Sequence, residues 1–218
     1  TDVKYGLISG PSFAKDLVGR KKIAVSFACH DDNLIMNMSK ATKSSFFEII
    51  PITDIYHIEI AGIIKNIAAI LCGMSDSFFG KEKYTNIIIK KASDEIWKMS
   101  YKALSDEKEE YDFPKNLDNY LSENKERIVT SPGFIGDMIL TCKQETSRNY
   151  QFGKLISDAD TTIRDAKNYI GTVEGYDCCI TLIEKSSYAV GNITKLLYEI
   201  INCANTRRED ILSNFLQA

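Results

Sequence analysis

The chain has 218 residues, of which 44% are hydrophobic, and 27 basic against 30 acidic side chains give it a formal net charge of -3. A chain of this length can form one large domain or two small ones with a buried core. Because charges of both signs are interspersed and the balance is slightly acidic, the composition argues against a nucleic-acid-binding protein.

The hydrophobic residues do not predict a membrane span. The longest apolar run, residues 67–74, is far shorter than the roughly 20 residues needed to cross a bilayer, and no basic segment followed by a hydrophobic one opens the chain. The six cysteines form no Cys-x-x-Cys pair, and only two histidines could join them, so no metal site is expected. We interpret the cysteines as reduced, buried thiols of a cytoplasmic protein.

The first 55 or so residues alternate between strand and helix patterns. Residues 5–9 predict a strand that ends at Gly10-Pro11, and residues 12–18 predict a short helix that stops at Gly19. Two further strands and one further helix follow, at residues 22–28, 46–52 and 31–43. This alternation is typical of part of a parallel sheet. Three strands are too few for a complete doubly wound sheet, and the Gly-x-Gly-x-x-Gly turn of a dinucleotide site does not occur in the sequence, so we expect a truncated domain.

Every segment from residue 58 onward has a helical pattern. The predicted helices cover residues 60–74, 85–104, 136–142, 147–156, 173–186 and 192–205. The fold class expected is therefore mainly α, with a truncated α/β Rossmann-type segment at the N-terminus followed by an all-helical substrate-binding domain. We place the two domains at residues 1–57 and 58–218.

A charged insertion interrupts the helical part at about residues 105–127. It is rich in Asp, Glu, Lys and Asn and contains Pro114, which predicts a solvated segment with one short helix around residues 117–121. A binding tail is the alternative. Because an electrostatic partner site would show blocks of one sign, the mixed charges favour the solvated segment.

Lys65 is the most informative residue, because it and Asn66 are the only strongly polar members of the apolar stretch 60–74. An ammonium group in an apolar helix must find a carboxylate, lose its proton more readily or face a polar cleft. The last two outcomes suit a catalytic acid or base, whereas a lysine that extends along the helix edge to water would be structural. The neighbours that share its helical face are all small and would leave room for a ligand: Ala61, Gly62, Ala68, Ala69 and Cys72.

Two further motifs carry polar side chains in the helical part. Asp137 and Thr141 are one turn apart on one helical face, and together could hold a lysine or a substrate alcohol, although Asp in a first turn is also favoured by the helix dipole. Ser147-Arg148-Asn149 combines an arginine fork that matches a phosphate with two neutral hydrogen-bonding groups. If Ser147 caps the following helix, free amides would face the same anion; otherwise the motif is a capped helix with a surface arginine.

Two weaker signals lie at helix starts. Gly10 and Ser12 follow a strand and open a helix, which is where ligands lie in open α/β sheets, although a tight turn explains them equally well. Thr172 and Glu174 lie at the start of another helix, where the helix dipole favours a carboxylate. The carboxylate could also accept hydrogen bonds from ribose hydroxyls.

Taken in order, five motifs resemble the NAD(P)-dependent glycerol-3-phosphate dehydrogenases over nearly the whole chain. They are Ser-Gly-Pro-Ser-Phe-Ala at 9–14, Gly-x-x-Lys-Asn at 62–66, Ser-Pro-Gly-Phe-Ile-Gly-Asp-x-x-x-Thr-Cys at 131–142, Ser-Arg-Asn-x-x-Phe-Gly at 147–153 and Val-Glu-Gly at 173–175. The resemblance implies a nucleotide-binding domain followed by a helical substrate domain. It also implies interconversion of sn-glycerol 3-phosphate and dihydroxyacetone phosphate with NAD or NADP as cofactor, which supplies the glycerophospholipid backbone.

The resemblance assigns roles to individual residues. Lys65 matches the catalytic lysine that exchanges a proton with the C2 oxygen of the substrate. Further substrate contacts fall on Gly10, Ser12, Asn66, Asp137, Thr141, Ser147, Arg148 and Asn149. Contacts with the dinucleotide fall on Ala14, Arg148, Thr172 and Glu174. No metal, nucleic acid or membrane span is expected, and a homodimer is possible.

The sequence also departs from the family pattern. Residues 76–83 replace a glycine-rich turn that ends in Asn, the insertion at 105–127 is long, and the dinucleotide turn and an upstream active-site lysine are absent. We therefore expect these 218 residues alone to bind NAD(P)H poorly and to turn over little. The alternatives are a β-hydroxyacid dehydrogenase of the 6-phosphogluconate type, which tends to show Lys-x-x-Asn rather than adjacent Lys and Asn, and a non-catalytic helical interaction module.

Overall fold

The computed structural model describes residues 4–12, 14–106, 117–185 and 190–218. Its contacts group into two compact units, each formed by two stretches of chain. The first unit comprises Thr1–Gly62 and Ser100–Asp137, and the second Ile63–Met99 and Met138–Ala218. The boundary expected between residues 57 and 58 stays a prediction about domains.

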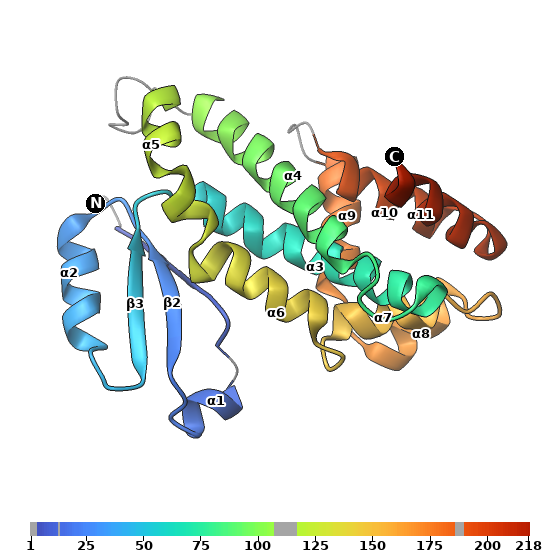
Figure 1. The fold of residues 1–218 in the computed structure, drawn as a ribbon, viewed down its shortest axis with the longest axis horizontal. Helices are drawn as coiled ribbons and strands as arrows, with labels where there is room; N and C mark the ends of the chain where they lie inside the picture. Colours follow the sequence, from blue (N-terminus) through green and yellow to red (C-terminus); the bar gives the residue numbers. More distant parts are fainter. Residues whose placement is uncertain (1–3, 13, 107–116, 186–189) are drawn as a thin grey trace. The chain divides into compact units, whose positions relative to one another are not determined.

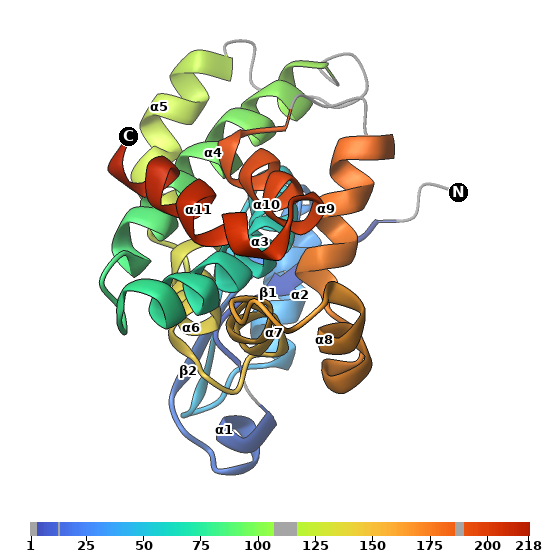
Figure 2. The same cartoon turned by 90° about the vertical axis from the view of Figure 1, so that its right-hand side faces the viewer.

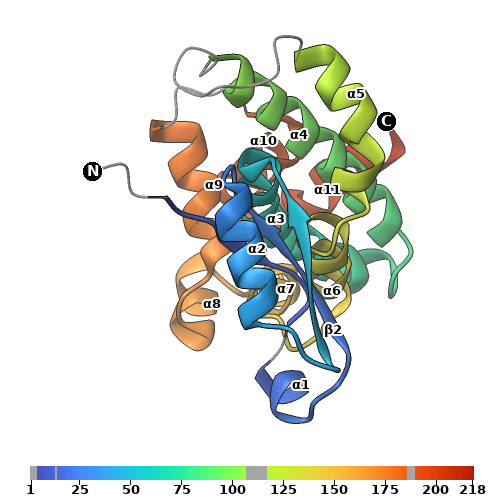
Figure 3. The ribbon, with the colours of Figure 1, turned by 90° about the vertical axis from the view of Figure 1, so that its left-hand side faces the viewer.

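The first unit contains a three-stranded sheet in the order β1-β2-β3, formed by Leu7–Ser9, Ile23–Ala28 and Phe47–Ile52. Strands β2 and β3 are parallel, as predicted, and their register runs from Ile23 opposite Phe47 to Ala28 opposite Ile52. Helix α2, Asp32–Ala41, connects them and lies against the sheet beside β3 (Figures 1 and 3). The mainly helical fold class, with a small sheet segment near the N-terminus, is thus confirmed.

The prediction of a wholly parallel sheet is wrong for β1, which pairs with β2 in the antiparallel direction, Leu7 opposite Ala28. The intervening helix α1, Ala14–Val18, has five residues and none of them is buried. A helix of that length rises only about 7.5 Å, too little to return along the sheet as a crossover helix must. The chain therefore reverses between β1 and β2 instead of crossing over.

The core of the first unit is built on β2, whose Val25 and Phe27 side chains are 0% and 3% exposed. A single π-helical turn, η1, Pro132–Gly136, packs against β2. There the Gly133 amide donates a hydrogen bond of 2.9 Å to the Ser26 hydroxyl. A Cβ on Gly133 would lie 2.9 Å from the Ser26 Cβ, so only glycine allows this close approach.

The charged insertion is more ordered than predicted where the structure describes it. Residues 107–116, including Pro114, lie outside the described residues, but helix α5 extends over Leu117–Val129 instead of stopping near residue 121. Its Leu121 and Ile128 side chains are 3% and 2% exposed, and Tyr120 hydrogen-bonds Thr53 at 2.6 Å. The prediction of a wholly solvated segment is therefore wrong for α5.

The second unit consists of helices. Helix α3 begins in the first unit and continues into the second, where α10 lies between α9 and α11 (Figure 2). Besides α1, α2 and α5, the described helices are α3 (Ile55–Phe79), α4 (Thr85–Asp106), α6 (Asp137–Lys143), α7 (Arg148–Ile156), α8 (Ile163–Ile170), α9 (Glu174–Lys185), α10 (Asn192–Asn202) and α11 (Arg208–Gln217), with the 3-10 turn η2 (Asn205–Arg207) before α11.

Two of these helices, α8 and α11, were not predicted. Helix α8 buries only Ala166, and it is stabilised at its start by the Thr162 hydroxyl, which accepts from the Asp165 amide at 3.1 Å. The spacing of Thr162 and Asp165 is that of a capping box, and could have indicated this helix.

Helix α3 is longer than predicted and explains the apolar stretch. With 25 residues and a window of mean hydropathy 1.6, it is the one helix among the described residues that is long and apolar enough to cross a membrane. Within that window 72% is buried inside the protein, which is typical of the core helix of a soluble protein. Its residues Ile67, Ile70, Leu71 and Met74 are each 0% exposed.

Helices α3 and α7 cross with their backbones in contact through a pair of glycines. A Cβ on Gly73 would lie 2.0 Å from the Tyr150 carbonyl oxygen, and a Cβ on Gly153 would lie 2.0 Å from the Ile70 carbonyl oxygen. Real Cβ atoms do not approach backbone oxygens so closely. The crossing therefore requires glycine on both helices.

The Gly153→Ala variant is expected to be destabilised by about 2–3 kcal/mol, because the added methyl group must push two helix backbones apart. Gly62→Ala is the matched control: it lies on α3 with nothing within 4 Å of its Cβ position, so alanine should stabilise the helix by about 0.5–1 kcal/mol. Urea unfolding of both variants measures the difference. Equal stability of the two variants would contradict the requirement for glycine at the crossing of α3 and α7.

Candidate active site

The first unit brings together two of the five sequence motifs. The end of β1 lies against the η1 turn and the start of α6, so the Ser9 hydroxyl is 3.5 Å from the Asp137 carboxylate and from the Gly133 carbonyl. Asp137 is 8% exposed. Ser9, which precedes the predicted substrate contact Gly10, is therefore a neighbour of the predicted contact Asp137, although 128 residues separate Ser9 and Asp137 in sequence.

Gly10 is required by its surroundings. It has a φ of +158°, and a Cβ there would lie 2.9 Å from the Val25 Cα of the neighbouring strand, so the segment reaches the η1 turn only with glycine. The Ser12 side chain is exposed and its hydroxyl donates to the Gly10 carbonyl at 3.2 Å. Ala14 is exposed at the first position of α1. Ser12 and Ala14 are thus accessible to a ligand.

The second unit contains a continuous hydrogen-bonded network that links α3, α7 and α9. The Asn149 amide nitrogen donates to the Asn66 side-chain oxygen at 3.0 Å, and the Asn66 amide nitrogen donates to the Glu174 carboxylate at 3.1 Å. The Asn149 side-chain oxygen in turn accepts from the Gly175 amide at 2.9 Å. We refer to Asn66, Asn149, Glu174 and Gly175 as the amide network.

The two asparagines of the amide network are buried, and the network is tightly fitted around Gly175. Asn66 and Asn149 are each 7% exposed, and a Cβ on Gly175 would lie 2.4 Å from the Asn66 carbonyl oxygen. Buried amides whose donors and acceptors are satisfied within the protein fix the position of the elements that carry them. The network therefore holds the start of α7 and the start of α9 against α3, directly beside Lys65.

Arg148 stands at the exposed edge of this network. Its guanidinium lies 3.8 Å from the Glu174 carboxylate, and the two side chains are 54% and 57% exposed. An ion pair this open to water contributes little to stability. Both groups are therefore available to a ligand: the guanidinium for a phosphate, and the carboxylate for a hydroxyl or amide.

The remaining predicted residues of the second unit have varied positions. Lys65 is half-buried on α3 and Thr141 is half-buried on α6, whereas Thr172 is exposed just before α9. Ser147 occupies the N-cap position of α7, but its hydroxyl makes no capping hydrogen bond. The side-chain cap by Ser147 that the sequence left open is therefore not formed.

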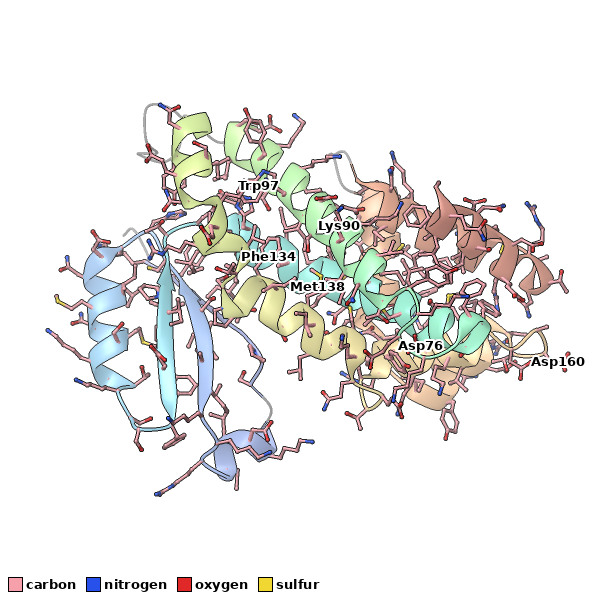
Figure 4. The ribbon with its side chains drawn as sticks, viewed as in Figure 1. Asp76, Lys90, Trp97, Phe134, Met138 and Asp160 are labelled. Atoms are coloured by element: carbon pink, nitrogen blue, oxygen red, sulfur yellow. The ribbon has the colours of Figure 1, made fainter. Side chains whose placement is uncertain are left out.

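The residues that replace the family's glycine-rich turn make a contact that the sequence did not indicate. Asp76, labelled in Figure 4, accepts from the Tyr150 hydroxyl at 2.6 Å and from the Glu82 amide at 2.8 Å. Burial, and then the hydrogen bond to Asp76, raise the pKa of Tyr150, so the phenol stays protonated and the bond persists. Asp76 thus ties the turn after α3 to α7, next to Asn149.

The six cysteines belong to no metal-ligating cluster in the part of the chain that the structure describes. No group of three or more His, Cys, Asp or Glu side chains there could hold a metal ion. All six cysteines are free, as predicted, and Cys29, Cys72, Cys142 and Cys179 are buried. The prediction of burial is wrong for Cys178 and Cys203, which are half-buried.

Comparison with known proteins agrees with this arrangement. The family model described as NAD-dependent glycerol-3-phosphate dehydrogenase C-terminus matches residues 54–211. The glycerol-3-phosphate dehydrogenase [NAD(P)+] of Acinetobacter baylyi is 28% identical over 204 residues, which is 92% of this chain and 51% of the relative. That of Wigglesworthia glossinidia brevipalpis is 28% identical over 213 residues, 96% of this chain and 59% of the relative. The chain spans about half the length of the curated relatives it matches.

Solved structures show the same fold. The crystal structure of glycerol-3-phosphate dehydrogenase from Coxiella burnetii superposes with a TM-score of 0.74 at 22% identity, over 98% of this chain and 60% of that one. The enzyme from Saccharomyces cerevisiae gives a TM-score of 0.69 at 17% identity, over 96% and 60%.

The fold is that of the C-terminal, helical part of a nicotinamide-dependent oxidoreductase. Within that class the family is defined by the model that matches residues 54–211, well over half of the chain. The chain belongs to the NAD-dependent glycerol-3-phosphate dehydrogenase family.

Proposed function

We propose that the protein that carries these residues interconverts sn-glycerol 3-phosphate and dihydroxyacetone phosphate by NAD(P)-dependent hydride transfer, and so supplies the backbone of glycerophospholipids. The observation that supports the proposal is the amide network. In this network Asn66, which follows the half-buried Lys65 on α3, is hydrogen-bonded to Asn149, which follows the exposed Arg148 on α7. The reduction of a phosphorylated ketone requires a proton donor near a cationic group that binds the phosphate.

The residues divide into three roles. Lys65 gives a proton to the C2 oxygen when the ketone is reduced and takes it back when the alcohol is oxidised. Arg148, with Ser147, binds the phosphate, whereas Asn66 and Asn149 orient these groups through hydrogen bonds that both amides already make within the protein. Asp137, Thr141, Gly10 and Ser12 are the remaining proposed substrate contacts.

The exposed polar groups near α9 fit a dinucleotide. Glu174 offers a carboxylate and Thr172 a hydroxyl at the start of α9, and Arg148 lies beside them. We propose that these three residues, with Ala14, contact NAD or NADP, which supplies the hydride when bound. The glycine-rich turn that binds the pyrophosphate does not occur in these 218 residues, so the chain alone should bind NAD(P)H weakly and be nearly inactive. Measurable reduction of dihydroxyacetone phosphate by these residues alone would contradict that expectation.

The phosphate role of Arg148 has a direct test in a polypeptide that carries these residues together with a nucleotide-binding domain. Arg148→Ala is expected to raise the KM for dihydroxyacetone phosphate about 10- to 100-fold, because a charge-assisted pair with the phosphate is lost. Folding should be unaffected, since the Glu174 ion pair is exposed. Initial rates of NADH oxidation measure the effect.

Arg164→Ala is the matched control, because Arg164 is an exposed arginine on α8 outside the proposed site. An unchanged KM in Arg148→Ala, or an equal rise in both variants, would reject the phosphate role. Activity with 6-phosphogluconate instead of dihydroxyacetone phosphate would favour the β-hydroxyacid alternative. Absence of activity with either substrate would favour a non-catalytic helical module.

A further inference from the structure

Three side-chain contacts connect the turn after α3 with the segment that leads into α7. They are the hydrogen bond from the Tyr150 hydroxyl to the Asp76 carboxylate at 2.6 Å, the Lys143–Glu82 ion pair at 3.1 Å and the Lys81–Glu145 ion pair at 2.7 Å. Each contact joins residues 76–82 to residues 143–150, and the second of these segments contains Ser147-Arg148-Asn149. The turn after α3 therefore contacts the part of the chain that carries the proposed phosphate-binding residues.

Of the three contacts, the hydrogen bond between Tyr150 and Asp76 is the best protected from water. Tyr150 is 2% exposed and Asp76 is half-buried, whereas the side chains of the two ion pairs are between 37% and 65% exposed. Exposed ion pairs contribute little to stability, and a buried hydrogen bond to a charged group contributes more. The bond between Tyr150 and Asp76 is therefore the contact that can fix the position of α7.

Asp76 uses both of its carboxylate oxygens. Oδ2 accepts from the Tyr150 hydroxyl, and Oδ1 accepts from the Glu82 amide at 2.8 Å. Glu82 has a φ of +57°, in the left-handed region that is unfavourable for a residue other than glycine, so the hydrogen bond from its amide stabilises the shape of the turn. Tyr150 also packs closely through its backbone, since a Cβ on Gly73 would lie 2.0 Å from the Tyr150 carbonyl oxygen. Asp76 thus links a stabilised turn to a tightly packed residue of α7.

The first turn of α7 depends on buried side chains for its position. Ser147 occupies the N-cap position without making a capping hydrogen bond, and a helix start without such a cap is less stable. The ion pair of Arg148 with Glu174, at 3.8 Å, is open to water. Asn149, in the amide network, and Tyr150 are therefore the buried side chains that anchor this turn.

We propose that Tyr150 and Asp76 are positioning residues for substrate binding, whose hydrogen bond holds the first turn of α7 where the Arg148 guanidinium can bind the phosphate of the substrate. This role rests on the proposed function, in which Arg148 is the phosphate ligand. Tyr150 acts through Arg148, two residues away on the same helical turn, and does not itself contact the substrate. Loss of the hydrogen bond should therefore weaken substrate binding and leave the chemical step nearly unchanged.

Tyr150→Phe removes only the phenol oxygen, and is tested in a polypeptide that joins these residues to a nucleotide-binding domain. The KM for dihydroxyacetone phosphate is expected to rise about 5- to 10-fold, with kcat changed by less than about twofold. Tyr198→Phe is the matched control, since it removes the hydrogen bond of a phenol to Glu184 between α10 and α9. It should leave the KM unchanged, as should Lys81→Ala, which removes one of the exposed ion pairs.

Initial rates of NADH oxidation measure these effects, on samples whose circular dichroism matches the parent protein. An unchanged KM in Tyr150→Phe, or an equal rise in either control, would overturn the proposal. Asp76→Asn keeps an acceptor for the phenol, so it should raise the KM less than Asp76→Ala.

A double variant shows whether Tyr150 acts through Arg148. In an Arg148→Ala background, Tyr150→Phe should change the KM by less than about twofold, because the group that it positions is absent. A further rise equal to that in the parent protein would overturn the positioning role. A KM raised by Arg148→Ala and not by Tyr150→Phe would overturn the positioning role alone, whereas a KM unchanged in Arg148→Ala would reject the phosphate role and the positioning role together.

Discussion

Replacing Lys65 with alanine is expected to lower kcat for dihydroxyacetone phosphate reduction by about 10³-fold or more, in a polypeptide that joins these residues to a nucleotide-binding domain. A positioned acid contributes about 10²–10⁴-fold to a proton transfer, and the alkoxide formed by hydride addition at C2 would otherwise have to take its proton from water. The KM should change much less, because Arg148 rather than Lys65 binds the phosphate.

The half-buried position of Lys65 makes this experiment specific. It lies on a helix whose neighbouring residues Ile64 and Asn66 are 0% and 7% exposed, so the helix stays packed when the lysine is shortened. The free energy of unfolding should therefore fall by no more than about 1 kcal/mol. A variant that loses its fold and its activity together would support the module interpretation, in which Lys65 has a structural role.

Two controls separate chemistry from charge. Lys90→Ala removes an exposed lysine of α4, labelled in Figure 4, and should leave kcat unchanged. Small primary amines added to Lys65→Ala should restore part of kcat, because they supply the missing acid in the space vacated by the side chain. A fully active Lys65→Ala protein would show that Lys65 is not the catalytic acid.

The sequence predicted the parts of the structure that depend on local pattern. The apolar stretch around Lys65 is a core helix, the parallel pair β2 and β3 follows from two strands joined by a helix, and the motif order identified the family that the model of residues 54–211 confirms. These features arise from periodicity and from short motifs, which a single sequence displays directly.

The parts that the sequence did not predict depend on partners far away in the chain. Nothing near Gly153 indicates that the Ile70 carbonyl lies 2.0 Å from its Cβ position, and nothing near Asp76 indicates Tyr150 as its partner. Such contacts are fixed by packing between elements rather than by the local sequence that forms each element.

Glu95 is the strongest case of a long-range contact, and it leads to the largest expected change in stability. This residue of α4 is 4% exposed. Its carboxyl group accepts hydrogen bonds from the Ile193 amide at 2.7 Å, from the Thr194 amide at 3.4 Å, and from the Thr194 hydroxyl. Gly191 occupies the N-cap position of α10 and makes no side-chain capping hydrogen bond. Glu95 therefore caps α10 from another helix, across 98 residues of sequence.

Glu95→Ala is expected to lower the free energy of unfolding by about 3–5 kcal/mol, because it leaves two buried amides of α10 without acceptors and opens a cavity beside Gly191. Glu95→Gln keeps the shape and one acceptor oxygen, so its cost should be about 1–2 kcal/mol. Asp94→Ala, an exposed neighbour on the same helix, should change stability by less than about 0.5 kcal/mol.

Urea unfolding followed by circular dichroism measures all three variants, and amide hydrogen exchange at Ile193 and Thr194 reports the cap itself. A capped helix end should exchange slowly in the parent protein and in Glu95→Gln, and quickly in Glu95→Ala. If Glu95→Ala unfolded at the same urea concentration as Asp94→Ala, the start of α10 would be stabilised by other contacts. The hydrogen bonds of the Glu95 carboxyl group would then result from the helix packing without stabilising it.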